Sequence, residues 1–220
     1  MLAMRPATPD DQPRLAVMIQ ARSDWMKDKQ LPNWRTWGRH VHELASNCTR
    51  HPSEMWVLTG RDERILGCTT VLRTAAPWTW TATEAAESAY YLNGTVTDPA
   101  ERHRKLGAVI AHWVVDRAAR EGISRVRRDC TSPALAEYYQ QQNFQLIRKV
   151  STRGGHTSYA LERKATRIPE LANRVISEIP TPERFEKPRT PLLPPEKRTA
   201  GTVQYLSRSL RGTGDAPATV

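Results

Sequence analysis

Cysteine is scarce in this 220-residue sequence, which contains only Cys48, Cys68 and Cys130. The three are odd in number, stand far apart and show no metal-site spacing. The sequence therefore indicates neither a disulfide framework nor a cysteine-based metal centre. We expect a protein that works in a reducing, cytoplasmic setting and holds no metal.

Long apolar runs are missing as well. No stretch approaches 18 consecutive apolar residues, so we expect no membrane-spanning helix. The first residues, MLAMRPATPDDQP, contain no hydrophobic segment typical of a signal peptide. No internal repeat is visible, and 39% hydrophobic residues are enough for the core of one ordinary domain.

Acidic residues are outnumbered: 23 Asp and Glu stand against 33 Lys and Arg, for a net charge of +10. Such an excess, with a pI near 9.9, invites a nucleic-acid interpretation. Much of the excess is scattered arginine, which is typical of a solvated surface. Part of it gathers in one short stretch, residues 102–105.

The apolar periodicity predicts a mixed α/β domain. We expect strands at 2–6, 55–59, 65–73, 89–97, 123–129, 144–151 and 157–163, and helices at 9–29, 34–46, 106–122 and 133–142. A helix joins strands 89–97 and 123–129, so these two should be parallel through a right-handed crossover. The fold class is then α/β, with a parallel centre and antiparallel edges.

The stretch RHRKLGAVIAHWVVDRAAREG, residues 102–122, follows a strand and opens a helix. The first backbone N–H groups of a helix lack internal partners, and the helix dipole favours an anion there. Gly107 would let a ligand approach the backbone closely, and Arg102 and Arg104 can add charge-assisted bonds. A strand, a basic loop with a glycine and a helix N-terminus in this order predict a phosphate-binding site. A solvated basic loop before an ordinary core helix remains the alternative.

The stretch resembles motif A of the GNAT N-acetyltransferases, Arg/Gln-x-x-Gly-x-Gly/Ala, at Arg102–Gly107, with Lys105 where the first glycine is expected. A second part, Tyr139–Phe144, is similar to the family's Tyr-x-x-x-Gly-Phe, with Asn143 in place of the glycine. The order of elements is also the GNAT order, so the resemblance covers about residues 1–165. It implies a GNAT-like mixed central sheet with flanking helices.

The resemblance implies acetyl-CoA as cosubstrate and no metal. The implied cofactor-binding residues are Thr95, Val96, Thr97, Arg102, His103, Arg104, Lys105, Leu106, Gly107, Ala108 and Ser132. The backbone of residues 95–97 would pair with the pantetheine arm, and residues 102–108 would hold the pyrophosphate. Tyr139 would be the general acid that protonates the leaving thiolate. A helix tyrosine whose hydroxyl merely finds a partner is the alternative.

The implied function is transfer of an acetyl group from acetyl-CoA to a primary amine of a small molecule or protein. Two alternatives stay open: a non-catalytic acyl-CoA-binding regulatory module, and a transferase that acts on or binds nucleic acid, such as charged tRNA. No general base stands out, because Glu84, Glu87 and Asp98 are more simply surface carboxylates. A homodimer is left open, no membrane partner is expected, and nucleic acid is the less favoured partner.

Five of the seven tryptophans fall where the resemblance places the acceptor, namely Trp25, Trp34, Trp37, Trp78 and Trp80. Aromatic walls would suit a cationic amine, although core packing is the favoured interpretation for Trp25 and Trp37.

The chain changes character after Ala165, where the predicted acetyltransferase domain (1–165) ends. Residues 166–220 are a basic, Pro-rich C-terminal extension with 8 of the 16 prolines. We expect a short helix near 168–179 and irregular or disordered structure beyond it.

Overall fold

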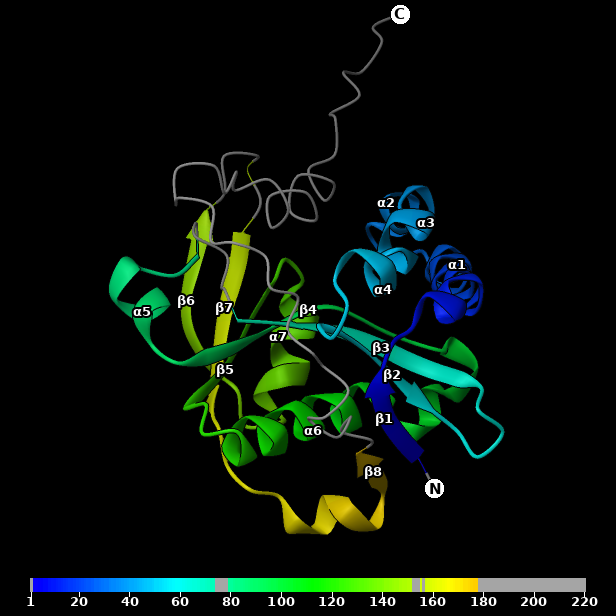
Figure 1. Cartoon of the computed structure of the whole chain (residues 1–220). Helices are drawn as coiled ribbons and strands as arrows, with labels where there is room; N and C mark the ends of the chain where they lie inside the picture. The colour runs from blue at the N-terminus through cyan, green and yellow to red at the C-terminus, as the bar shows by residue number, and fades with distance from the viewer. Residues whose placement is uncertain (1, 74–78, 152–154, 156, 178–220) are drawn as a thin grey trace, which may run out of the picture.

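The computed structural model describes residues 2–73, 79–151, 155 and 157–177 (Figure 1). They form an eight-stranded mixed sheet in the order β6-β7-β5-β4-β3-β2-β1-β8. The predicted α/β class, with a mixed central sheet and flanking helices, is confirmed.

The strands are β1 (Leu2–Pro6), β2 (Met55–Thr59), β3 (Ile65–Leu72), β4 (Ala89–Thr97), β5 (Arg125–Cys130), β6 (Gln145–Ser151), β7 (Thr157–Lys164) and β8 (Val175–Ser177). The helices are α1 (Gln12–Asp28), α2 (Trp34–Arg39), α3 (Val41–Ala45), α4 (Asn47–Arg50), α5 (Ala82–Ala86), α6 (Leu106–Arg120) and α7 (Pro133–Gln140). Three short 3₁₀ segments accompany them, η1 (Pro9–Asp11), η2 (Pro99–Arg104) and η3 (Pro169–Asn173). Each expected strand is present, with its ends shifted by no more than two residues.

Helices cover both faces of the sheet, with α6 and α7 on one side and α1–α4 on the other (Figure 1). The predicted apolar stripe of α6 is buried against the sheet, from Leu106 through Val109, Ile110 and Trp113 to Ala118. On the other face, α1 and α3 bury a second cluster that includes Leu15 and Ile19. These are the two larger hydrophobic clusters among the described residues, and a third, smaller one joins Leu72, Trp80, Tyr91 and Ala160.

One expected helix is divided. Residues 34–46 were predicted as a single helix, but α2 ends at Arg39 and α3 begins at Val41. Gly38, a poor helix former, lies in the last turn of α2. The next residue but one, His40, departs from helical geometry (φ −108°, ψ 15°), and its Nδ1 pairs with Glu43 at 2.9 Å.

The two central strands, β4 and β5, separate part-way along their length. As predicted, β4 and β5 are parallel, but they pair only from Ala89–Tyr91 to Arg125–Arg127. Beyond Tyr91, the register of β4 against β3 shifts between Cys68 and Thr70. Gly94 sits in this shift with φ +60°, a conformation that favours glycine. The β5-facing edge of β4 is therefore left without its strand partner over residues 92–97.

The start of the C-terminal extension joins the sheet. In place of the helix expected near 168–179, residues 169–173 form η3, and β8 pairs in parallel with β1, Leu2 opposite Val175. Asp116 of α6 accepts a hydrogen bond from the Ile168 N–H at 2.8 Å, which fixes this segment along the helix. β-Branched Val175 then suits a strand better than a helix. Residues 178–220, with the rest of the predicted extension, lie outside the described residues.

Candidate active site

The basic loop lies between the end of β4 and the start of α6. Asp98 caps η2 by accepting the Ala100 N–H at 2.9 Å. Lys105 then takes a left-handed conformation (φ 52°, ψ 43°) immediately before Leu106. This is the conformation that glycine adopts most readily. The residue that departs from the glycine motif thus keeps the backbone shape a glycine would give, and adds a positive charge.

A cavity of about 600 Å³ opens beside this loop. It is lined by Leu2, His103, Arg104, Lys105, Leu106, Ala108, Val109, His112, Asn173 and Arg174. Five of the predicted cofactor residues meet there, and the named lining contains no acidic side chain. His112 and Arg174 were not predicted. Arg174 belongs to the extension, and only the pairing of β8 with β1 brings it to the loop.

Some of the cations around the cavity have partners. Arg104 pairs with Glu101 at 3.0 Å. Burial lowers the pKa of His112, and the nearby charges of Arg163 and Arg174 lower it further. His112 therefore favours its neutral form, and the fixed charge at the cavity comes from its arginines and lysine.

The other predicted cofactor residues lie on β4, η2 and α6 and at the N-cap of α7. Thr95 shares a hydrogen bond with Thr69 at 2.8 Å, Val96 is buried opposite Cys68, and Thr97 pairs with Gly67. Arg102 is exposed on η2. Ser132 caps α7 by accepting the Leu135 N–H at 3.3 Å. Gly107 is approached closely: a Cβ there would stand 3.0 Å from the Tyr138 hydroxyl.

Two adjacent tyrosines on α7 have different surroundings. Tyr139 is 2% exposed, with its ring edge-on to Phe144 and the Arg128 guanidinium 3.6 Å from its ring centre. Tyr138 is half-buried, and its hydroxyl reaches the first turn of α6 at Gly107. Burial raises the pKa of Tyr138, and its hydrogen bond with the Ala108 backbone opposes that rise.

Helix α1 also comes close to Tyr138. Burial lowers the pKa of Arg22 on α1, and the interaction with Tyr138 opposes that fall. The Tyr138 hydroxyl thus lies at the first turn of α6, within range of the charge of Arg22 on α1. Successive helix residues point about 100° apart, so sequence position alone did not show which of the two tyrosines faces the loop.

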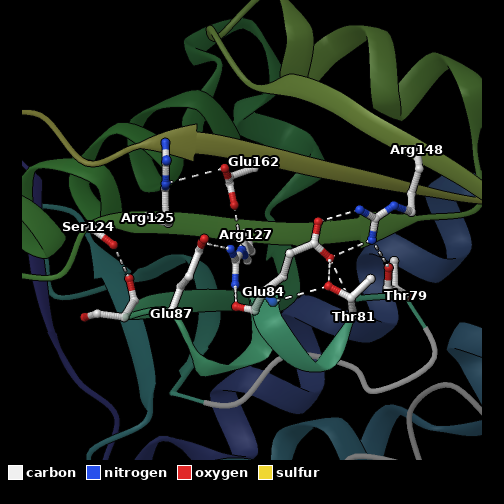
Figure 2. Close-up of polar contacts among 10 residues, drawn as sticks. Thr79, Thr81, Glu84, Glu87, Ser124, Arg125, Arg127, Arg148 and Glu162 are labelled. Carbon is white, nitrogen blue, oxygen red and sulfur yellow. Dashed lines mark hydrogen bonds and ion pairs between the residues drawn. The ribbon is translucent and has the colours of Figure 1, made fainter.

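Two of the three carboxylates weighed as bases, Glu84 and Glu87, are bound to arginines (Figure 2). Arg148 donates hydrogen bonds to Glu84, and this lowers the pKa of Glu84 to about 2. Glu87 pairs with Arg127, which is 1% exposed and also donates to Glu162 at 2.6 Å and to the backbone carbonyl of Glu84. The network ties the segment around α5 to β5, β6 and β7.

Two residues that the sequence did not single out follow the point where β4 and β5 separate. Arg128 has its Nε and Nη1 buried without a hydrogen-bond partner among the described residues. Asp129 accepts a hydrogen bond from Ser158 at 3.2 Å through Oδ2, whereas its buried Oδ1 has no described partner. Burial raises the pKa of Asp129 to about 6. The only signal in the sequence was a charged run, RVRRDC, inside a strand.

Three of the tryptophans proposed to line the acceptor pocket already make cation–π contacts with arginines of this chain. Arg22 lies 4.4 Å from the Trp25 ring centre, and Arg35 lies 4.5 Å from that of Trp34. Buried Trp80 has Arg127 at 4.6 Å. Trp37 packs against the core of α1 and α3. Trp78 lies outside the described residues.

Within the part of the chain that the structure describes, no three His, Cys, Asp or Glu side chains group so that they could hold a metal ion. None of the described helices has the length and apolar character to cross a membrane.

The parted central strands, the basic turn and the start of α6 all lie within residues 19–144. The model of the Acetyltransferase (GNAT) family matches residues 19–144, and the chain belongs to this family. The predicted resemblance is therefore confirmed. A search of curated proteins gave no match.

Solved structures share the fold at low sequence identity. A GNAT acetyltransferase from Listeria monocytogenes is 16% identical, with a TM-score of 0.58 over 74% of this chain and 94% of its own. A GNAT-family protein from Desulfovibrio desulfuricans is 15% identical, with a TM-score of 0.57 over 76% of this chain and 100% of its own. The PaiA N-acetyltransferase of Thermoplasma acidophilum, in complex with coenzyme A, is 12% identical, with a TM-score of 0.53 over 74% and 99%.

Proposed function

We propose that the protein transfers the acetyl group of acetyl-CoA to a primary amine of a small molecule or a protein. The observation that carries this proposal is the cavity at the start of α6, where His103, Arg104, Lys105, Leu106 and Ala108 gather. An anionic cofactor suits a helix N-terminus surrounded by cations. That a family member of the same fold holds coenzyme A supports the same ligand here.

The cofactor's two ends would use different parts of the site. The diphosphate would lie against the first N–H groups of α6, with Arg102, Arg104 and Lys105 supplying charge-assisted contacts. The pantetheine arm would run along the edge of β4 that β5 leaves free, and pair with the backbone of residues 95–97. The thioester would then lie between the two strands.

The leaving thiolate needs a proton, and two adjacent hydroxyls are candidates. Tyr139 holds the position that the family motif assigns to the acid, and we keep it as the proposed donor. Tyr138 is the rival, because its hydroxyl, not that of Tyr139, approaches Gly107 on α6. A positioned acid is worth roughly 10²–10⁴-fold in rate, so single substitutions can separate the two.

Binding of acetyl-CoA tests the cofactor site by isothermal titration calorimetry. The double variant Arg102→Ala/Arg104→Ala should bind acetyl-CoA more weakly, each charge-assisted contact contributing about 1.5–3 kcal/mol. The matched control is Arg35→Ala/Arg39→Ala, which removes two exposed arginines from α2 on the opposite face of the sheet. Equal affinity in the wild type and the loop variant would contradict the site.

Turnover separates an enzyme from a binding module. Acetyl-CoA should be consumed with at least one member of a panel of primary amines that includes a polyamine, an aromatic amine, an amino acid and a peptide with a free N-terminus. Tight binding of acetyl-CoA without turnover of any amine would favour the non-catalytic module. Turnover only with aminoacylated tRNA would favour the nucleic-acid acceptor.

A further inference from the structure

We propose that Asp129 is the group that takes the proton from the acceptor amine, a role that rests on the function proposed above. In the sequence, Glu84, Glu87 and Asp98 were considered as general bases, and Asp129 was not. In the structure the first three are committed to Arg148, to Arg127 and to the Ala100 N–H, respectively. Asp129 is the carboxylate left with an unused oxygen beside the parted strands.

The position of Asp129 follows from the pairing of β5. On one side, β5 pairs with β7 along its whole length, and Asp129 lies opposite Ala160. On the other side, pairing with β4 ends at Arg127, so Asp129 comes two residues after the strands separate. That separation is where the thioester would lie in the proposed cofactor arrangement.

Strand alternation places the carboxylate on the face away from α7. Side chains alternate along a strand, and Arg128 lies on the α7 side, against Tyr139. Asp129 contacts Ser158 on the opposite side, and Ala160, two residues along β7, clusters there with Trp80 and Tyr91. The cofactor's phosphates would occupy the α6 side. An amine approaching the thioester from the other side would therefore meet Asp129.

The chemical state of Asp129 suits a proton acceptor. Its Oδ2 is held by Ser158 at 3.2 Å, whereas its buried Oδ1 has no hydrogen bond among the described residues. Burial raises the pKa of Asp129 to about 6, and the bond from Ser158 opposes that rise. Such a group is charged at neutral pH and is a stronger base than an exposed aspartate.

Two arginines on the neighbouring elements are paired with other carboxylates, and a third, Arg128, lies on the α7 side against Tyr139. On β5, Arg127 is bound to Glu87 near α5 and to Glu162 of β7. On β6, Arg148 is bound to Glu84. Within the described residues, the pKa of Asp129 is set by burial and hydrogen bonds, with no ion pair to it.

The reaction balances with Asp129 as base. Asp129 takes one proton from the ammonium form of the acceptor, and the neutral nitrogen attacks the thioester carbonyl carbon. A C–N bond forms, the C–S bond breaks, and its electron pair leaves on sulfur. The tyrosine hydroxyl of α7 gives its proton to the departing sulfur. The new amide nitrogen releases its second proton to solvent, and the tyrosine takes one back from solvent. Asp129 finally returns its proton to solvent.

The substitution Asp129→Asn tests the role, with Asp62→Asn in the exposed β2–β3 turn as matched control. Turnover with the best amine of the panel should fall by roughly 10²–10⁴-fold in Asp129→Asn, with acetyl-CoA affinity unchanged. Asp129→Glu, which keeps a carboxylate, should retain more turnover than Asp129→Asn. Asp62→Asn should match the wild type.

A pH profile adds a signature that a merely structural residue would not give. In the wild type, kcat/KM should fall on the acidic side with an apparent pKa near 6. Ser158→Ala removes the hydrogen bond that stabilises the carboxylate, so this limb should move to higher pH.

The outcomes are distinct. Turnover in Asp129→Asn within about threefold of the wild type, or an acidic limb that Ser158→Ala leaves in place, would overturn the role of Asp129 while the acetyltransferase function stands. A wild-type protein that binds acetyl-CoA but acetylates no amine would overturn both.

Discussion

At the scale of single residues, Lys105 combines a backbone cost with a useful charge. An L-residue in the left-handed region costs about 1–2 kcal/mol relative to its usual conformations, and Lys105 occupies that region at φ 52°. Glycine would avoid the cost but would lose the cation beside the cavity. The chain therefore keeps a strained lysine at the position where the family motif has glycine.

We expect Lys105→Gly to be more stable than Lys105→Ala by about 1 kcal/mol, because only glycine relieves the left-handed backbone. Both variants lose the same charge, so both should bind acetyl-CoA more weakly than the wild type, and to a similar extent. Urea unfolding and calorimetry measure the two effects separately. A Lys105→Ala variant as stable as Lys105→Gly would argue against strain at this position.

Ionisation of Asp129 should affect the pH dependence of the free energy of unfolding as well as the activity. Its folded-state pKa of about 6 exceeds the ordinary value of 3.8, so the native state binds its proton more tightly than the unfolded state does. The free energy of unfolding therefore falls as pH rises from about 4 to 6, by at most about 3 kcal/mol from this group.

Asp129→Asn removes that titration. The variant should be more stable than the wild type at pH 8 and close to it at pH 4, as measured by urea unfolding at both values. Asp62→Asn should show no such pH-dependent difference. A variant that is less stable than the wild type at pH 8 would mean that the charged carboxylate stabilises the fold.

At the scale of elements, helix α7 presents neighbouring tyrosines to two environments. The family motif predicts that Tyr139→Phe lowers turnover by roughly 10²-fold and leaves acetyl-CoA binding nearly unchanged, since in the proposed arrangement the phosphates lie at the basic loop. Tyr138→Phe is the matched comparison, because it removes the same atom one residue away. A loss confined to Tyr138→Phe would assign the acid to Tyr138.

The segment around α5 depends on the ion pairs drawn in Figure 2. Arg127→Met should destabilise the protein by about 3–5 kcal/mol, because it leaves Glu162 and Glu87 without their buried partner. Arg148→Met breaks a more exposed pair and should cost about 1 kcal/mol or less. Urea unfolding of both variants measures the difference. Equal losses in the free energy of unfolding would show that the burial of Arg127 does not add to the effect of its ion pairs.

At the scale of the whole molecule, the sheet continues past the sequence-based boundary at Ala165. Residues 166–177 bury Leu171 and Val175 and add β8 next to β1. A chain ending at Ser177 should keep the stability of the described fold. A chain ending at Ala165 should lose about 3–6 kcal/mol, from two buried aliphatic side chains at about 1.5–3 kcal/mol each.

Thermal unfolding of the two truncated chains checks this expectation. The shorter chain should also bind acetyl-CoA more weakly, since it lacks Arg174 at the cavity. Equal melting temperatures for the chains ending at Ala165 and at Ser177 would support the domain boundary predicted from the sequence, at Ala165.

The sequence by itself determined what depends on local periodicity and local chemistry. The apolar stripe from Leu106 to Ala118 predicted α6, Ser132 offered a capping side chain for α7, and the basic cluster predicted the proposed phosphate site. These features need only a helix period of 3.6, a capping side chain or a run of like charges. The family pattern then supplied the fold and the class of reaction.

Only the tertiary structure decided which distant segments meet. Glu84 is a poor candidate for the general base because Arg148, 64 residues away in the sequence, donates hydrogen bonds to its carboxylate. Val175 became a strand residue because β1 offered a free edge. Asp129 gained an unusual pKa because the sheet buried one of its oxygens without a partner. Burial and long-range pairing are properties of the assembled chain, and no local period in the sequence encodes them.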